Sequence, residues 1–147
     1  MKLSPVLKYP GAKWNLASWI IEHMPPHTTY LEPFFGSGAV FFNKRPSKVE
    51  TINDIDGNVV NLFRVIRERP EELARLIEFT PWARDEYYAS YDKTGESLED
   101  ARRFLVRCWQ AFGSDQSKKV GWRHGTYQSY GSLPSQRWPR LPKNILR

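Results

Sequence analysis

This chain of 147 residues has one cysteine, no cluster of histidines and no long apolar run, and each of these features excludes a class of protein. The single cysteine, Cys108, excludes an internal disulfide and suits a reducing compartment. No Cys or His cluster has zinc-like spacing, so we expect no metal. No apolar run approaches membrane-spanning length and no signal-peptide core opens the chain, so we expect a cytoplasmic location.

Acidic residues are nearly absent from the last third of the chain. Residues 101–147 contain ten Lys or Arg and one acid, Asp115, whereas residues 1–100 contain 12 basic and 15 acidic residues. This asymmetry predicts a polyanionic partner, and double-stranded DNA is the natural candidate. A solvated basic tail is the alternative, but such tails are poor in aromatics. Here aromatic residues alternate with the cations: Trp109, Phe112, Trp122, Tyr127, Tyr130 and Trp138.

A glycine pair between two apolar segments is the most informative pattern present. The segment 30–40 indicates a strand, a tight turn at Gly36 and Gly38, and the start of a helix. A Gly-x-Gly alone is a weak signal, but two neighbours strengthen it. Residues 8–13 form a turn flanked by lysines, and residues 51–56 form a β-rich run ending in acids. An acid at that spacing accepts hydrogen bonds from ribose in doubly wound folds.

Two other nucleotide sites fit the glycine pair less well. The dinucleotide fingerprint of an oxidoreductase requires a third glycine three residues after Gly38, where Phe41 stands. A phosphate loop requires Gly-Lys-Ser or Gly-Lys-Thr, which does not follow the glycines.

Three segments together resemble the Dam-type family of adenine-specific DNA methyltransferases, which use S-adenosylmethionine. Residues 8–13 are similar to its Lys-aromatic-x-Gly-Gly-Lys motif, residues 31–38 to its cofactor loop and residues 53–58 to its acidic segment. The resemblance implies methyl transfer to the exocyclic amino group of a flipped adenine in duplex DNA, without metal, as in restriction–modification systems. It also implies a set of cofactor-binding residues: Tyr9, Lys13, Glu32, Phe35, Gly36, Gly38 and Asp54.

The chain is predicted to be an α/β protein with two parts. Residues 1–58 would form the N-terminal part of an incomplete Rossmann-like methyltransferase sheet, and residues 59–147 a mainly helical target-recognition domain with a basic loop or hairpin. The individual elements are predicted from periodicity and caps. Strands are expected at 29–32 and 49–53, and helices at 15–24, from Ala39 to Asn43 and onward, 58–69, 70–79, 82–91 and 98–112, with loops or a hairpin after Gly113.

The expected helix caps and inner faces follow from the same patterns. Asn58 and Ser97 are the predicted caps of their helices. The inner face of helix 98–112 would hold Ala101, Leu105, Cys108 and Phe112.

DNA contacts are predicted in the basic region. Lysines suit phosphates, an arginine can bind guanine with two hydrogen bonds, and an aromatic ring can fill the gap left by a flipped base. The residues assigned to this role are Arg107, Lys118, Lys119, Trp122, Arg123, His124 and Tyr127.

One motif of the family is missing from these 147 residues. No Asp-Pro-Pro-Tyr or Asn-Pro-Pro-Tyr occurs, so no catalytic residue can be assigned. In the family this motif accepts hydrogen bonds from the target amino group and stacks on the flipped base. We therefore expect an inactive fragment that stops before the motif. The alternative is a non-catalytic DNA-binding module derived from such an enzyme.

Overall fold

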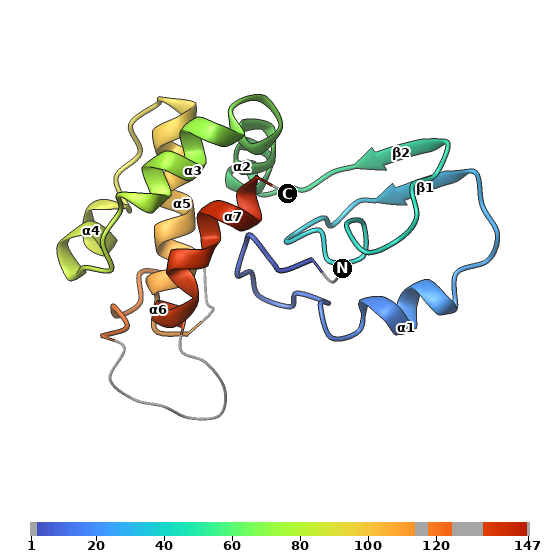
Figure 1. Cartoon of the computed structure of the whole chain (residues 1–147), viewed down its shortest axis with the longest axis horizontal. Coiled ribbons are helices and arrows are strands. Elements are labelled where there is room, and N and C mark those ends of the chain that lie inside the picture. The colour runs from blue at the N-terminus through green and yellow to red at the C-terminus, as the bar shows by residue number, and fades with distance from the viewer. Residues whose placement is uncertain (1–2, 114–117, 125–133, 147) are drawn as a thin grey trace.

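The structure is a computed structural model that describes residues 3–113, 118–124 and 134–146. It is a mixed α/β arrangement in which a small sheet and a short helix stand beside a group of helices (Figure 1). The first part holds α1 (Ala17–Glu22), β1 (Thr29–Glu32) and β2 (Val49–Ile52). The second part holds the remaining elements, which are α2 (Gly57–Glu68), α3 (Pro70–Glu78), α4 (Arg84–Ala89), α5 (Ser97–Gln110), α6 (Pro134–Arg137), η1 (Trp138–Arg140) and α7 (Leu141–Ile145).

The two strands pair in parallel, and the connection between them is long enough for the crossover that parallel pairing requires. Thr29 lies opposite Val49, and Glu32 lies opposite Ile52. Within the described residues the sheet has these two strands alone. All four residues of β2 are exposed and β1 alternates between exposed and half-buried positions, whereas parallel sheets usually have both faces covered.

The segment after Gly38 differs from the predicted helix. It makes one helical turn, in which the Phe42 amide donates to the Gly38 carbonyl (2.9 Å) and the Lys44 amide to the Val40 carbonyl (3.0 Å). No helix is assigned between β1 and β2. The chain then reaches Pro46, which cannot donate a backbone hydrogen bond and limits any continuation.

The helices from α2 to α5 lie close to the predicted ranges, but their caps differ. Asp56, rather than Asn58, caps α2 by accepting the Asn58 amide, and Glu96, rather than Ser97, caps α5 by accepting the amides of Leu98 and Glu99. Both carboxylates lie at a positive helix end, where a negative charge is favourable. Each predicted cap therefore lies one or two residues too late.

Residues 134–146 were predicted as part of a segment of loops or a hairpin, and they contain helices instead. Pro139 and Pro142 stand in the first turns of η1 and α7, where a helix loses no hydrogen bond to proline. Trp138, Leu141 and Ile145 are buried, and α7 packs against α3. Tertiary burial thus stabilises helices that are too short to be stable alone.

One hydrophobic core joins the two parts of the chain. Leu7 and Phe35 belong to the same buried cluster as residues of α2, α3, α5 and α7. Cys108 is buried in α5, as predicted. Phe112 was predicted on the inner face of this helix and is 67% exposed, because α5 ends at Gln110 and the extended backbone of Ala111 turns the chain outward.

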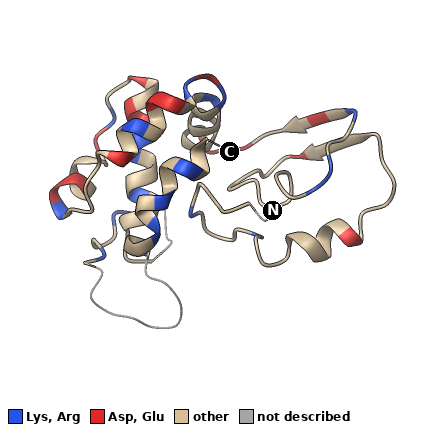
Figure 2. Ribbon diagram, viewed as in Figure 1, with Lys and Arg blue, Asp and Glu red and all other residues tan. Residues whose placement is uncertain are grey.

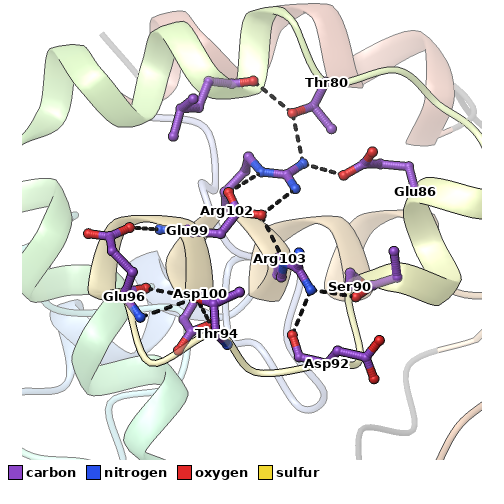
Figure 3. A network of polar contacts seen from close by, with 12 residues as sticks. Thr80, Glu86, Ser90, Asp92, Thr94, Glu96, Glu99, Asp100, Arg102 and Arg103 are labelled. Atoms are coloured by element: carbon purple, nitrogen blue, oxygen red, sulfur yellow. Dashed lines mark hydrogen bonds and ion pairs between the residues drawn. The ribbon is translucent and has the colours of Figure 1, made fainter.

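A polar network fastens α4 and the end of α3 to α5 (Figure 3). The Arg102 guanidinium donates two hydrogen bonds to Glu99, at 2.8 and 2.7 Å, and also contacts Glu86. It reaches Thr80 at 3.1 Å, beyond the end of α3. Arg103 donates to Glu99 and to the carbonyls of Ala89 and Asp92, each at 2.8 Å. These contacts fix the angle between α4 and α5.

Candidate functional site: a pocket at the carboxyl ends of the strands

A cavity of about 420 Å³ opens where the two strands end. Its lining comes from three segments far apart in the sequence, namely the turn after Leu7, the loop after β1 and the loop after β2. Parallel sheets commonly place ligands at this edge. Of the seven residues predicted to bind a cofactor, six line the cavity: Tyr9, Lys13, Glu32, Phe35, Gly36 and Asp54.

Asp54, which follows β2, binds the backbone of the glycine turn that follows β1. The Gly36 amide donates to Asp54 Oδ2 at 2.7 Å, and the Asp56 amide donates to Asp54 Oδ1 at 2.9 Å. Gly36 has a φ of 51°, a conformation that favours glycine. The Asp54 carboxylate thus holds the turn and lines the cavity at the same time.

Tyr9 forms a second wall and is held by Asp56, which the sequence did not indicate as a site residue. The Tyr9 hydroxyl donates to Asp56 Oδ2 at 3.0 Å. The ring lies against the glycine turn, since a Cβ on Gly36 would be 3.3 Å from Tyr9 Cδ1. Partial burial and the neighbouring carboxylates of Asp56 and Asp54 raise the pKa of Tyr9 well above its usual range. The phenol is therefore a neutral hydrogen-bond donor.

Trp14 and Ser37 form another contact that sequence reasoning missed. The Trp14 indole Nε1 donates to Ser37 Oγ at 3.0 Å and so ties the N-terminal segment to the glycine turn. Neighbouring Lys13 is exposed, and its ammonium contacts the Gly11 carbonyl at the rim of the cavity.

Glu32 brings a half-buried carboxylate into the cavity. It accepts a hydrogen bond from the Tyr30 hydroxyl at 2.8 Å. Burial raises the pKa of Glu32, while hydrogen bonds from Tyr30 and the Phe41 amide and the charge of Lys44 oppose that rise. A cation in the cavity would favour the ionised form of this carboxyl.

Gly38 is the predicted residue that does not line the cavity. Its φ is 66°, and its amide donates to the Phe35 carbonyl at 2.8 Å. A Cβ here would come within 2.6 Å of both Phe35 Cζ and Phe42 Cε2. Gly38 therefore permits the close packing behind the pocket.

The basic segment 118–124 is attached to the end of α5. The Phe112 amide donates to the Gly121 carbonyl (2.7 Å), and the Arg123 amide donates to the Gln110 carbonyl (2.8 Å). The Trp82 indole also donates to the Arg123 carbonyl at 2.8 Å. Figure 2 shows acids on α3, α4 and the start of α5, whereas segment 118–124 and α6–α7 carry only basic charges.

The side chains predicted to bind DNA have different surroundings. Lys119 lies over the rings of Tyr88 and Tyr91, and Arg123 lies over Phe112. Lys118 and His124 are exposed. The indole of Trp122 donates to Gln110 Oε1 at 3.1 Å.

Arg107 shares the Tyr91 ring with Lys119 but is less exposed. It is half-buried, contacts the Ser90 carbonyl and stacks near Tyr91 and Phe104, and burial lowers its pKa. Tyr127 lies outside the described residues.

Within residues 3–113, 118–124 and 134–146, no three His, Cys, Asp or Glu side chains are grouped to hold a metal ion. No helix in that same part of the chain has the length and apolarity to cross a membrane.

Comparison with known proteins gives matches over most of the chain. The model of the D12 class N6 adenine-specific DNA methyltransferase family matches residues 9–131. The chain is 36% identical to the type II methyltransferase M1.LlaDCHI of Lactococcus lactis over 78 residues, which are 52% of this chain and 27% of that protein. It is 29% identical to the DNA adenine methylase of Vibrio cholerae over 140 residues, 90% of this chain and 50% of that protein. For the enzyme of the same name from Serratia marcescens, the values are 29% identity over 106 residues, 68% of this chain and 38% of that protein. The chain thus spans half or less of the length of these relatives.

Proposed function

We propose the function of this chain from one premise, that it belongs to the D12 class of N6 adenine-specific DNA methyltransferases. The chain provides a pocket for the methyl donor S-adenosylmethionine and a surface for duplex DNA, and it serves methyl transfer to the amino group of a flipped adenine. Residues 1–58 correspond to the first part of a Rossmann-like donor domain, and residues 59–147 to the target-recognition domain. The observation that carries this proposal is the meeting of Tyr9, Lys13, Gly36 and Asp54 around one cavity.

The chemistry of the cavity fits the proposed donor. Its volume of about 420 Å³ lies within the usual range for small-molecule sites, roughly 300–1,000 Å³. When bound, the donor supplies an electrophilic methyl group on a positively charged sulfonium. The carboxylates of Glu32 and Asp54 line the cavity and favour a cation there. The exposed Lys13 ammonium is available for the negative carboxylate at the other end of the amino acid portion.

Three residues that line the pocket have distinct roles in this proposal. Gly36 lets the backbone approach the ligand closely, Asp54 holds that turn, and Tyr9 forms the facing wall. No catalytic residue is assigned, because the Asp-Pro-Pro-Tyr or Asn-Pro-Pro-Tyr sequence that would accept the hydrogens of the target amino group does not occur in the 147 residues. The alternative function is a DNA-binding module without catalysis.

Titration calorimetry with S-adenosylmethionine tests the donor pocket. We expect saturable binding with a Kd of about 100 µM. Typical sites bury most of the ligand surface, whereas the exposed Gly11 and Lys13 leave part of this ligand in contact with water. Asp54→Ala should weaken binding at least ~10-fold, since the Gly36 amide loses its partner. The exposed acid Asp92 provides the control, and Asp92→Ala should bind as the unaltered chain does.

Two outcomes would contradict the donor pocket. One is the absence of any saturable heat with S-adenosylmethionine, and the other is equal binding of a nicotinamide dinucleotide. A methylation assay on unmodified DNA separates the two functional alternatives. We expect no transfer by the 147-residue chain alone, and robust transfer would exclude the non-catalytic module.

Salt-dependent DNA binding tests the second surface. We expect Lys119→Ala and Arg123→Ala each to lower the slope of log K against log salt by about one, because each side chain would neutralise one phosphate. Phe112→Ala should leave the slope unchanged because it removes no charge, and it should weaken binding only through Arg123, which lies over the Phe112 ring. Arg67→Ala is the control, because Arg67 lies on α2 and pairs with Glu68. An unchanged slope in both cation variants would contradict this surface.

A further inference from the structure

Asp56 makes contacts in two directions at the edge of the pocket. Its Oδ1 accepts the Asn58 amide at 2.9 Å and the Asn58 side-chain amide at 3.0 Å, which caps α2. Its Oδ2 accepts the Tyr9 hydroxyl at 3.0 Å. One half-buried carboxylate therefore joins the N-terminal segment, through a residue 47 positions away, to the first turn of the helical part.

The contact with Tyr9 reaches the glycine turn. The Tyr9 ring lies close to Gly36, and both residues line the cavity. Asp54 binds the Gly36 amide directly, at 2.7 Å. One carboxylate thus accepts a hydrogen bond from the backbone of the turn, and the other accepts one from the tyrosine whose ring lies beside the turn. Asp54 also accepts the Asp56 amide at 2.9 Å, which links the two acids.

We propose that Asp56 is a positioning residue of the donor pocket, which it shapes by holding the Tyr9 ring against the Gly36 turn. This proposal rests on the function proposed above. It goes beyond that function because the family resemblance assigns no role to Asp56. The simpler reading is that Asp56 only caps α2 and that its contact with Tyr9 is incidental.

Two substitutions separate positioning from capping. Asp56→Ser keeps a good helix cap, because serine accepts the same backbone amide, but its side chain is too short to reach Tyr9. Tyr9→Phe removes only the hydroxyl and leaves the cap of α2 intact. If Asp56 acts through Tyr9, each change removes the same link. The double variant Tyr9→Phe with Asp56→Ser should then cost no more affinity than either single variant.

Calorimetry with S-adenosylmethionine gives the first measurement. We expect each single variant and the double variant to weaken binding by the same factor, about 10-fold, which corresponds to the loss of one hydrogen bond to a charged group. Unchanged affinity in Tyr9→Phe would overturn the proposal, and so would two losses that multiply in the double variant. Capping alone predicts no effect of Tyr9→Phe.

Hydrogen exchange of the ligand-free chain gives the second measurement and needs no donor. We expect the Gly36 amide to exchange ~10-fold faster in both single variants, because the turn opens more often once the ring is released. The amide of Val65, buried in α2, should be unaffected. If the unaltered chain bound no donor but Gly36 exchange still rose, the donor assignment would fail and the positioning role would stand. Unchanged Gly36 exchange in both variants would refute the positioning role itself.

Discussion

Gly38→Ala should destabilise the chain by about 3 kcal/mol, or roughly 10 °C in Tm for a chain of this size. Two effects add. The backbone at Gly38 has a φ of 66°, which costs any other residue about 1 kcal/mol or more. A methyl group would also come within 2.6 Å of Phe35 and Phe42, and both rings belong to a cluster of edge-to-face aromatic pairs. Thermal unfolding followed by circular dichroism measures the loss.

Two other glycines provide matched controls for this prediction. Gly95 has a φ of 81° with nothing within 4 Å, so Gly95→Ala should show the backbone cost alone, about 1 kcal/mol. Gly57 lies in the first turn of α2 with open space around it, so Gly57→Ala should be neutral or stabilise by up to about 1 kcal/mol. Equal losses at Gly38 and Gly95 would show that the rings move aside at no cost.

Arg102→Ala should lower the free energy of unfolding by about 2–3 kcal/mol, because two carboxylates lose their shared cation. The Arg102 side chain is 13% exposed, and Glu86 and Glu99 are about one quarter exposed, so water replaces the lost contacts only in part. The Thr80 hydroxyl also loses a donor at 3.1 Å. Figure 3 shows that these contacts join α5 to α4 and to the end of α3. Urea unfolding at neutral pH measures the change.

The acid dependence of this loss provides a further check. Hydrogen bonds from Arg102 lower the pKa of Glu99 below its ordinary value. A carboxyl whose pKa is lower in the folded state than in the unfolded state stabilises the fold at pH values above its unfolded-state pKa. That contribution disappears as the pH falls through the folded-state pKa. The difference between Arg102→Ala and the unaltered chain should therefore shrink in acid. Arg67→Ala is the control, since Arg67 is 73% exposed and its pairing with Glu68 should matter by less than about 0.5 kcal/mol. A loss at Arg102 as small as this would contradict the prediction.

Local signals predicted much of the fold. Residues 29–32 form β1 as expected, and β2 ends one residue early, because short apolar runs bounded by Pro, Asn and Asp identify strands well. Helix caps were misplaced because several neighbouring polar residues can cap, and only the folded backbone selects among them. The helices after residue 133 were missed because their stability comes from burying Trp138, Leu141 and Ile145, while their prolines suggested loops.

The sequence predicted those residues of the candidate site that directly follow a recognisable strand. The glycine turn and Asp54 follow strands, so topology alone brings them to one edge. Asp56 and the pair of Trp14 with Ser37 were missed because each depends on a partner far away in the sequence, at separations of 47 and 23 residues. Single-chain patterns contain no signal for such pairs.

The poor cover of β1 and β2 has a consequence for how this protein opens. Leu31 is 60% exposed and Val49 52%, whereas Leu62, Leu73 and Leu105 in the helices are fully buried. The free energy of local unfolding is therefore lower for the strands than for the helices. The strands can separate in a partial opening that leaves α2 and α5 intact. A molecule bound at the strand ends would stabilise β1 and β2 against this partial opening. It raises the free energy of only those openings that destroy its binding site.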